Sequence, residues 1–339
     1  MGILKNFLYC FILILMTGCY ETFTPDIDFK PVLCLNSLIK AGEPIEVKVT
    51  HTWLYSDIEK LKDHSVDDAI LYIYANEVLV DSDYIPKESD KIKIIAESKK
   101  FGVAEAEVNI PYATPIDSLD WEIDLISFNK EDNEDYSMNG SFYFNLIIKV
   151  TISDLNDSSD YFNISFKDFS YESPEDEIKT ADLEEGNNKS TFFAGGYLNY
   201  DAEPIFFENI EEMESIYGAA TGFNFFTDKS FSGSSYTLKL HFVNCKYYIM
   251  SEEWNPELLN FGKTIFLNSV SKSYYDWNYY HSFIESGVMG DISDFGFIDP
   301  IWGYSNVSTG AGVVAAQSTI SYKVVLKDYF EKFLKSLQL

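Results

Sequence analysis

Arginine is absent from the sequence, and all 25 basic residues are lysines. Sites that recognise carboxylates or phosphates through two parallel hydrogen bonds usually use the planar guanidinium of arginine, so its absence argues against an anionic ligand. The lysines are outnumbered by 54 acidic residues, and the chain carries a formal net charge of −29. Such a surface repels the phosphate backbone of DNA and RNA, which excludes nucleic acids as partners.

Histidine is scarce, and the four histidines of the chain are His51, His64, His241 and His281. Hydrolytic enzymes with a serine or cysteine nucleophile usually need a histidine base. None of the four lies in an H-E-x-x-H motif, and no serine lies in a G-x-S-x-G motif. The sequence therefore indicates no catalytic residue and no cofactor, and it predicts a protein that is not an enzyme.

Apolar runs long enough to span a membrane are lacking as well. A spanning helix needs about 20 apolar residues. The run Phe7–Met16 has about ten and follows Lys5, which is typical of the h-region of a signal peptide. It ends in Leu15–Cys19 (LMTGC), which resembles the lipobox of bacterial lipoproteins. We expect residues 1–18 to be a signal peptide and Cys19 to be the lipid-attachment residue. The alternative is an ordinary secretory signal whose cysteine is accidental.

Cysteine is rare outside this leader. Cys10 lies within the signal peptide and Cys19 would carry the lipid, which leaves Cys34 and Cys245 in apolar, strand-like runs. In an oxidising compartment these two residues could form a disulfide. We favour two buried free thiols, because cysteine packs well as a small apolar residue.

Residues 19–30 show no hydrophobic periodicity and are predicted to be the lipid anchor and its tether. Between residues 31 and 115, short stretches alternate between apolar and polar residues. The alternating apolar residues include Ile45, Val47 and Val49. Short strands of this kind predict a small immunoglobulin-like β-sandwich domain over 31–115. Pro111 and Pro115 mark its end, because proline interrupts strand pairing.

Residues 116–339 are predicted to form a larger, mostly antiparallel β domain with one or two helices. Longer alternating stretches occur at residues 141–153, 161–166 and 235–243. A helix is plausible at 327–339. The expected fold class is therefore mainly β throughout.

The stretch Ser273–Ser286 has the periodicity of a helix rather than a strand. One face of this helix would carry Tyr274, Trp277, His281 and Ile284. We expect that face to pack on the β domain, and we expect Tyr275 and Tyr279 to lie nearer to solvent.

Aromatic residues make up 17% of the chain and are concentrated late in the sequence. They suit either a stacking platform for a sugar or partner protein, or the core and edges of a large β domain. We favour core packing for most of them. The candidates for a ligand- or partner-binding platform are Tyr275, Tyr279, Trp302 and Tyr304.

The stretch Asp154–Asp160 (DLNDSSD) gathers carboxylate and amide oxygens within a few residues. Oxygen ligands at such spacing suit calcium, but the glycine and terminal glutamate of the helix–loop–helix calcium site are missing. Asn, Asp and Ser are also the ordinary residues of a hairpin turn. We interpret the stretch as a turn and predict no metal site.

Four stretches along the chain share an order and spacing with a known group of proteins. They are PVLCLN at residues 31–36, IP with PIDSL at 110–119, FTDKSFSG at 226–233 with the Tyr-rich 271–283, and GYSNV with GAGV at 303–313. Together with the lipobox they resemble a family of Bacteroidota lipoproteins of unknown function, often encoded beside TonB-dependent receptors of the outer membrane. The resemblance implies an outer-membrane location and such a receptor as partner, and it implies no reaction.

These observations lead us to expect a lipid-anchored accessory or binding protein of the outer membrane. It would work with a TonB-dependent receptor in nutrient capture or uptake. The face of the membrane and the ligand, a glycan or another small molecule, are left open. The alternatives are an envelope hydrolase acting on glycans or peptides, and a purely structural envelope protein.

Overall fold

The computed structural model of the chain describes residues 29–53, 64–81, 83–129, 140–154, 160–171, 191–207, 224–249, 260–285 and 303–336. The predicted signal peptide, Cys19 and Trp302 lie outside these ranges. Among the described residues, no helix is both long enough and apolar enough to cross a membrane.

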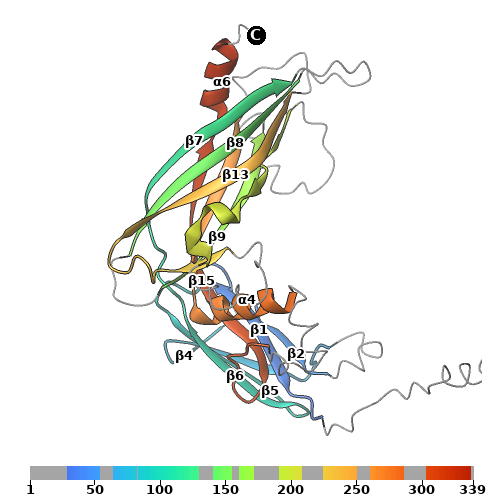
Figure 1. Cartoon of the computed structure of the whole chain (residues 1–339). Helices are drawn as coiled ribbons and strands as arrows, with labels where there is room; N and C mark the ends of the chain where they lie inside the picture. The colour runs from blue at the N-terminus through green and yellow to red at the C-terminus, as the bar shows by residue number, and fades with distance from the viewer. Residues whose placement is uncertain are drawn as a thin grey trace, which may run out of the picture.

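Three β sheets make up the described part of the molecule (Figure 1). The six-stranded sheet has the order β12 (Phe225–Thr227), β9 (Tyr161–Tyr171), β14 (Asn260–Val270), β15 (Ala311–Val325), β1 (Leu33–Lys40) and β2 (Lys48–His51). The five-stranded sheet has the order β10 (Thr191–Ala194), β13 (Ser235–Ile249), β8 (Gly140–Ser153) and β7 (Ile116–Asn129), with β11 (Tyr197–Leu198) paired to β13. The four-stranded sheet has the order β4 (Val78–Val80), β3 (Ile70–Ala75), β5 (Lys91–Ser98) and β6 (Gly102–Asn109).

Neighbouring strands in these sheets pair antiparallel, apart from the parallel pair β1 and β15. The prediction of a mainly β, mostly antiparallel fold is therefore confirmed. The immunoglobulin-like character of its first part stays a prediction.

The six-stranded sheet is shared by two β sandwiches. In the lower sandwich of Figure 1, the four-stranded sheet packs against β1 and the first half of β15. In the upper sandwich, the five-stranded sheet packs against β9, β14 and the end of β15. Val314 and Ala316 belong to the lower core and Val324 to the upper core, so the single strand β15 serves both.

Alternation along the strands explains why these segments form a core. In β8 every second residue from Phe142 to Ile152 is buried, while the residues between them are half-buried. This period of two directs one face of the strand into the upper sandwich. The same pattern in β5 buries Ile92, Ile94 and Ala96 in the lower sandwich.

β1 and β15 lie far apart in the sequence and pair from Cys34 opposite Ala311 to Lys40 opposite Gln317. The lower sandwich is therefore not built from residues 31–115 alone, because its core also needs β15. Local alternation identifies a strand but not its partner, and so it could not reveal this pairing. The predicted boundary coincides with the start of β7, while the division into two domains stays a prediction.

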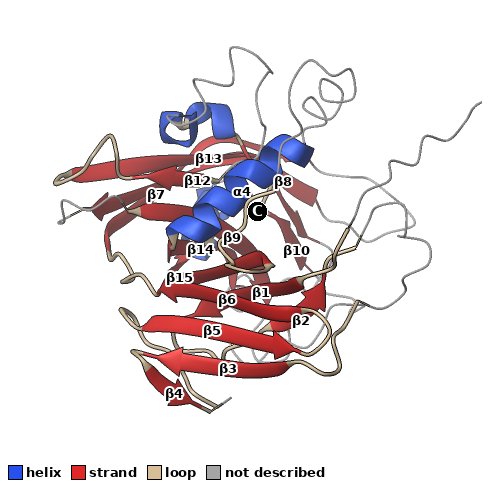
Figure 2. Cartoon of the chain, turned by 90° about the horizontal axis from the view of Figure 1, so that it is seen from below, coloured by secondary structure: helices blue, strands red, loops and turns tan. Residues whose placement is uncertain are grey.

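Two α-helices accompany the described sheets, α4 (Lys272–Glu285) and α6 (Lys327–Ser336), close to the helices expected at 273–286 and 327–339. Short 3₁₀ helices occur at η2 (Tyr200–Ala202) and η3 (Pro204–Phe207). α6 continues directly from β15 and buries Phe330 in the upper core. α4 lies beside β15 at the waist between the two sandwiches (Figure 2).

The beginning of α4 is attached to β15 by two serines. The Ser271 hydroxyl accepts a hydrogen bond from the Ala316 amide at 3.0 Å, and the Ser273 hydroxyl donates to the Val314 carbonyl oxygen at 3.0 Å. Ser271 also caps the helix, because its hydroxyl accepts from the amide of Tyr274 at 3.4 Å, while its carbonyl oxygen accepts the first helical hydrogen bond from the Tyr275 amide at 3.1 Å. These contacts determine which face of α4 meets the sheets.

The predicted orientation of this helix is wrong for Trp277 and Tyr275, whereas Tyr274 is half-buried and packs against Phe225 as expected. Tyr275 is only 6% exposed and packs with Phe225 and Val270, whereas Trp277 is 36% exposed and stacks on His281. Tyr279 is half-buried. Aromatic residues occur on several faces of this helix, so their spacing could not predict its rotation about its own axis. The hydrogen bonds of Ser271 and Ser273 with β15 set this rotation instead.

The two described cysteines are free, as predicted, but only Cys245 is buried as expected. Cys34 lies in β1 of the lower sandwich and is half-buried, while Cys245 lies in β13 of the upper sandwich and is fully buried. Burial raises the pKa of both thiols, to about 11 for Cys245.

Candidate functional site

A cleft of ≈ 890 Å³ lies at the waist, where the two sandwiches meet. Its walls come from the segment between β6 and β7, the end of β8, the start of β9, the junction of β14 with α4, and residues 304–306. Ligand sites are common in such concave regions between structural units. We refer to this region as the waist cleft.

The segment between β6 and β7 forms one wall because polar contacts attach it to the six-stranded sheet. The Thr114 amide donates to the Ser269 hydroxyl at 3.0 Å, and that hydroxyl donates to Thr114 Oγ1 at 3.1 Å. The Ser318 hydroxyl donates to the Pro111 carbonyl oxygen at 2.6 Å. These contacts hold the segment between the two prolines of the predicted boundary against the sheet, along the cleft.

A smaller pocket of ≈ 430 Å³ adjoins the waist cleft and shares Tyr161, Lys272 and Tyr304 with it. Tyrosines dominate its lining: Tyr161, Tyr275, Tyr279, Tyr280 and Tyr304. We refer to it as the tyrosine pocket. The Tyr280 and Tyr304 rings are nearly parallel, with centroids 6.0 Å apart, and Tyr275 and Tyr279 are arranged likewise at 6.3 Å.

Two charged residues that line the tyrosine pocket, Lys272 and Asp276, form an ion pair beside Tyr304. Lys272 pairs with Asp276 one helical turn later, with Nζ and Oδ2 at 2.5 Å, and this hydrogen bond raises the pKa of Lys272. Burial, and secondarily the Asp276 charge, raises the pKa of Tyr304. The tyrosine hydroxyl therefore stays protonated at neutral pH, and it can donate a hydrogen bond to a ligand.

The predicted platform residues are partly brought together. Tyr279 and Tyr304 line the same pocket, but the buried Tyr275 contributes to its wall rather than to an exposed surface. Tyr280 and Tyr161 were not among the candidates. Tyr280 belongs to the same Tyr-rich stretch, whereas Tyr161 comes from β9 and no local signal connects it with α4.

Three carboxylates gather beside both cavities. Asp154, Asp160 and Asp228 each place an oxygen within 4.8 Å of the others. Asp154 and Asp160 line the waist cleft, and Asp228 lines the tyrosine pocket. The turn interpretation of residues 154–160 did not include Asp228, which is distant in sequence.

Strand register explains why Asp228 joins the other two. β12 pairs with β9 so that Thr227 lies opposite Tyr161, which places Asp228 beside Asp160. β13 pairs with β8 so that Ser235 lies opposite Ser153. The turn from 228 to 234, which connects β12 to β13, is thereby brought next to the end of β8.

The histidines lie elsewhere. His51 and His64 stack on Phe101 and Trp53 in the lower sandwich. His241 lies in β13, and His281 stacks on Trp277. The residues that line the waist cleft and the tyrosine pocket, all of them in the described ranges, include no histidine.

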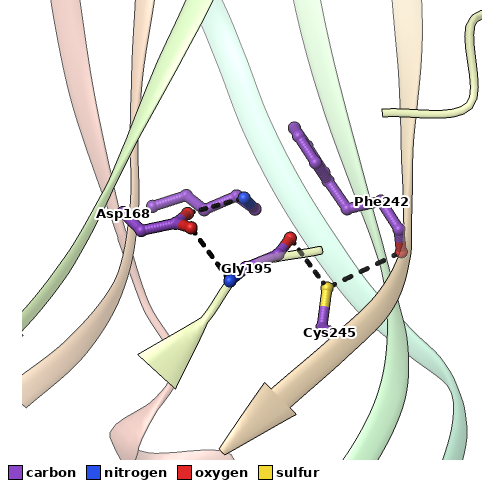
Figure 3. A network of polar contacts seen from close by, with 5 residues as sticks. Asp168, Gly195, Phe242 and Cys245 are labelled. Carbon is purple, nitrogen blue, oxygen red and sulfur yellow. Dashed lines mark hydrogen bonds and ion pairs between the residues drawn. The ribbon is translucent and has the colours of Figure 1, made fainter. Parts of the chain in front are cut away.

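A second polar group lies inside the upper sandwich (Figure 3). The fully buried Lys263 donates to Asp168 Oδ1 at 2.6 Å, and the Gly195 amide donates to Asp168 Oδ2 at 2.9 Å. The Phe242 and Phe166 rings lie 4.1 and 5.1 Å from the Lys263 ammonium. A Cβ on Gly195 would lie 2.1 Å from Asp168 Oδ1, so only glycine fits there. Because these contacts satisfy one another within the core, we assign this group a structural role.

Comparisons of the chain with protein-family models, with curated proteins and with solved structures find no match.

Proposed function

We propose that this protein is a lipid-anchored accessory protein of the outer membrane that binds a neutral, hydroxyl-rich ligand, such as an oligosaccharide, at its waist. The observation that carries the proposal is the tyrosine pocket opening beside the waist cleft. Tyrosine offers an apolar ring face for stacking and a hydroxyl for hydrogen bonding, which together suit a sugar.

Charge supports a neutral ligand over an anionic one. The waist cleft is lined by the carboxylates of Glu107, Asp117, Asp154 and Asp160 and by one lysine, Lys272. The tyrosine pocket is lined by two carboxylates, Asp228 and Asp276, and two lysines, Lys229 and Lys272. The chain has no arginine for a carboxylate or phosphate to bind, and its net charge of −29 repels anions over longer distances.

The membrane location and the partner rest on the sequence. The lipobox-like Leu15–Cys19 supports lipid attachment at Cys19. The resemblance to Bacteroidota lipoproteins supports a TonB-dependent receptor as partner in nutrient uptake. Anchoring on the same membrane would raise the effective concentration of the protein beside the receptor, so that modest contacts suffice.

Hydrolysis of a glycan is supported less well by the geometry. Two carboxylates that act on a glycosidic bond stand on either side of it, about 5–5.5 or 6.5–9.5 Å apart. Asp154, Asp160 and Asp228 form a single cluster in which one oxygen of each lies within 4.8 Å of the others, and Asp228 is only 2% exposed. A buried carboxylate of this kind cannot reach the anomeric carbon of a sugar.

A screen of the full-length protein in detergent against a library of oligosaccharides tests the proposal. We expect saturable binding to one or more neutral oligosaccharides, and weaker binding to their uronic acid or sulfated counterparts, because the waist cleft carries more carboxylates than lysines and the chain has a net charge of −29. Preferential binding of the anionic members, or binding to none of the library, would contradict the proposal.

A further inference from the structure

Asp228 is the most unusual member of the carboxylate cluster formed by Asp154, Asp160 and Asp228. It is only 2% exposed, and its Oδ1 accepts a hydrogen bond from the Asp160 amide at 3.0 Å. Its Oδ2 is buried and has no hydrogen-bond donor among the described residues. A buried carboxylate oxygen without a donor is costly, and such atoms in a native fold call for a ligand or another compensating group.

From this arrangement we propose that Asp154, Asp160 and Asp228 bind a calcium ion. Two oxygens on one Ca²⁺ ion lie at most about 5 Å apart, because each Ca–O distance is about 2.3–2.6 Å. The three carboxylates meet this condition, since one oxygen from each lies within 4.8 Å of the others. The buried Oδ2 of Asp228 would then gain the positive partner that it lacks.

Electrostatics within the cluster favour a cation at this position. One oxygen from each of the three carboxylates lies within 4.8 Å of the others, so the ionised groups repel one another. The Asp160 amide donates to Asp228 Oδ1 at 3.0 Å, and no described residue donates to Asp228 Oδ2. A divalent cation at this position overcomes the repulsion between the carboxylates, because it stabilises all three in their ionised form.

The donor set selects the kind of cation. All three ligands are carboxylate oxygens, which suit hard cations such as Ca²⁺ and Mg²⁺, whereas zinc sites usually include histidine or cysteine. The ligands come from three separate segments, the end of β8, the start of β9 and the turn after β12. Ca²⁺ accepts irregular geometry with 6–8 oxygens, while Mg²⁺ demands a near-ideal octahedron, so Ca²⁺ fits this cluster better.

The backbone around the cluster is organised to hold these ligands. The Asp228 amide donates to the Asp160 carbonyl oxygen at 3.3 Å, which pairs the two residues reciprocally. Asp154 Oδ2 accepts from the Gly233 amide at 3.0 Å, and the Asp154 amide donates to the Ser234 carbonyl oxygen at 2.9 Å. The turn from 228 to 234 is thus tied at both ends to the segments that supply the other two ligands.

The ion would lie between the waist cleft and the tyrosine pocket, since Asp154 and Asp160 line the first and Asp228 lines the second. It would hold the wall between the two cavities in place and reduce its negative charge. Calcium binding at this cluster does not require that the ligand of the two cavities be a sugar.

Calcium binding is measured by titrating CaCl₂ into the full-length protein in detergent after treatment with a chelating resin. We expect one saturable site per chain with a dissociation constant of about 1 mM or lower, and a rise of the melting temperature when Ca²⁺ is added. Asp228→Asn keeps the shape of the side chain and an oxygen for the Asp160 amide, but it removes a ligand charge. This variant should weaken Ca²⁺ binding at least about tenfold and lose the thermal shift.

Asp117→Asn is the matched control. Asp117 also lines the waist cleft but lies outside the cluster, and its carboxylate accepts from the Ser153 hydroxyl at 2.6 Å, a contact that asparagine can keep. It should bind Ca²⁺ as the wild type does. Asp160→Asn, at a less buried ligand, should repeat the loss seen with Asp228→Asn. The proposal would be overturned if the wild type had no saturable Ca²⁺ site. It would also be overturned if Asp117→Asn and Asp228→Asn lost Ca²⁺ affinity equally, because Ca²⁺ would then only collect on an acidic surface.

Discussion

Cys245 shows how burial controls the chemistry of a single residue. Its thiol donates to the Gly195 carbonyl oxygen at 3.1 Å, and burial raises its pKa from 9.0 to about 11. In the unfolded chain the thiol would ionise near its ordinary pKa. Between pH 9 and 11 the native state therefore holds a proton that the unfolded state has lost, and stability falls as the pH rises through this window.

A comparison of Cys245→Ala with the wild type isolates this effect. Near pH 10 the thiol should lower the free energy of unfolding of the wild type by about 1 kcal/mol relative to neutral pH, beyond any loss in Cys245→Ala. Urea unfolding at pH 8 and pH 10 measures the difference. Equal pH dependence in the two proteins would show that the thiol is not buried as described.

The Lys263–Asp168 pair is asymmetric in burial, which leads to an unequal cost for losing either partner. Lys263 is fully buried, whereas the Asp168 side chain is 36% exposed. Asp168→Asn leaves a buried ammonium without its carboxylate and should cost about 3 kcal/mol. Lys263→Met leaves a carboxylate that water can reach and that keeps the Gly195 amide, so it should cost less. Chemical denaturation gives both values, and a larger loss for Lys263→Met would refute this account.

At the scale of single elements, α4 offers the clearest test because two of its aromatic residues differ in burial. Tyr275 is 6% exposed and packs with Phe225 and Val270, while Trp277 is 36% exposed. Tyr275→Ala should destabilise the protein by about 3 kcal/mol, and Trp277→Ala should cost about 1 kcal/mol or less. Thermal unfolding of the two variants decides the rotation of the helix. The reverse order would restore the face expected from the sequence.

The elements themselves were largely predictable, and their partners were not. Alternation in residues 141–153 and 235–243 predicts β8 and β13, and helical spacing predicts α4 within one residue at each end. The parallel pairing of β1 with β15 depends on contacts between residues about 280 positions apart, which local patterns do not encode.

The candidate site was predictable to the same limited extent. Composition and spacing directed attention to Tyr279 and Tyr304, which do share a pocket. Asp228 could not be connected with Asp154 and Asp160, because only the registers of β12 with β9 and of β13 with β8 bring it to them. Sequence spacing within the 154–160 stretch alone indicated a turn.

At the scale of the whole molecule, one long strand joins two sandwiches (Figure 1). The waist cleft lies where the two sandwiches meet. The lipid anchor would tether this assembly to the membrane. Cys19→Ala should abolish metabolic labelling with a palmitate analogue and move the protein out of the membrane fraction. Labelling that persists in this variant would rule out attachment at Cys19.

The proposed partnership also belongs to the whole molecule. Chemical cross-linking in intact cells should recover a large β-barrel receptor together with the wild-type protein. Recovery should fall in Cys19→Ala, because loss of the anchor lowers the effective concentration beside the receptor. Repeated recovery of periplasmic enzymes alone would contradict an accessory role in uptake.

The central claim is that the waist of the molecule binds a neutral oligosaccharide through its tyrosines. Its most direct test is isothermal titration of the tightest neutral binder from the oligosaccharide screen into the wild type, Tyr280→Ala and Tyr322→Ala. Tyr280 is 41% exposed and lines the tyrosine pocket, whereas Tyr322 is 51% exposed and lies on β15 away from it, so neither change should disturb folding. Loss of one stacking ring should weaken binding about five- to tenfold in Tyr280→Ala and leave Tyr322→Ala unchanged. Equal affinity in all three proteins would contradict the claim.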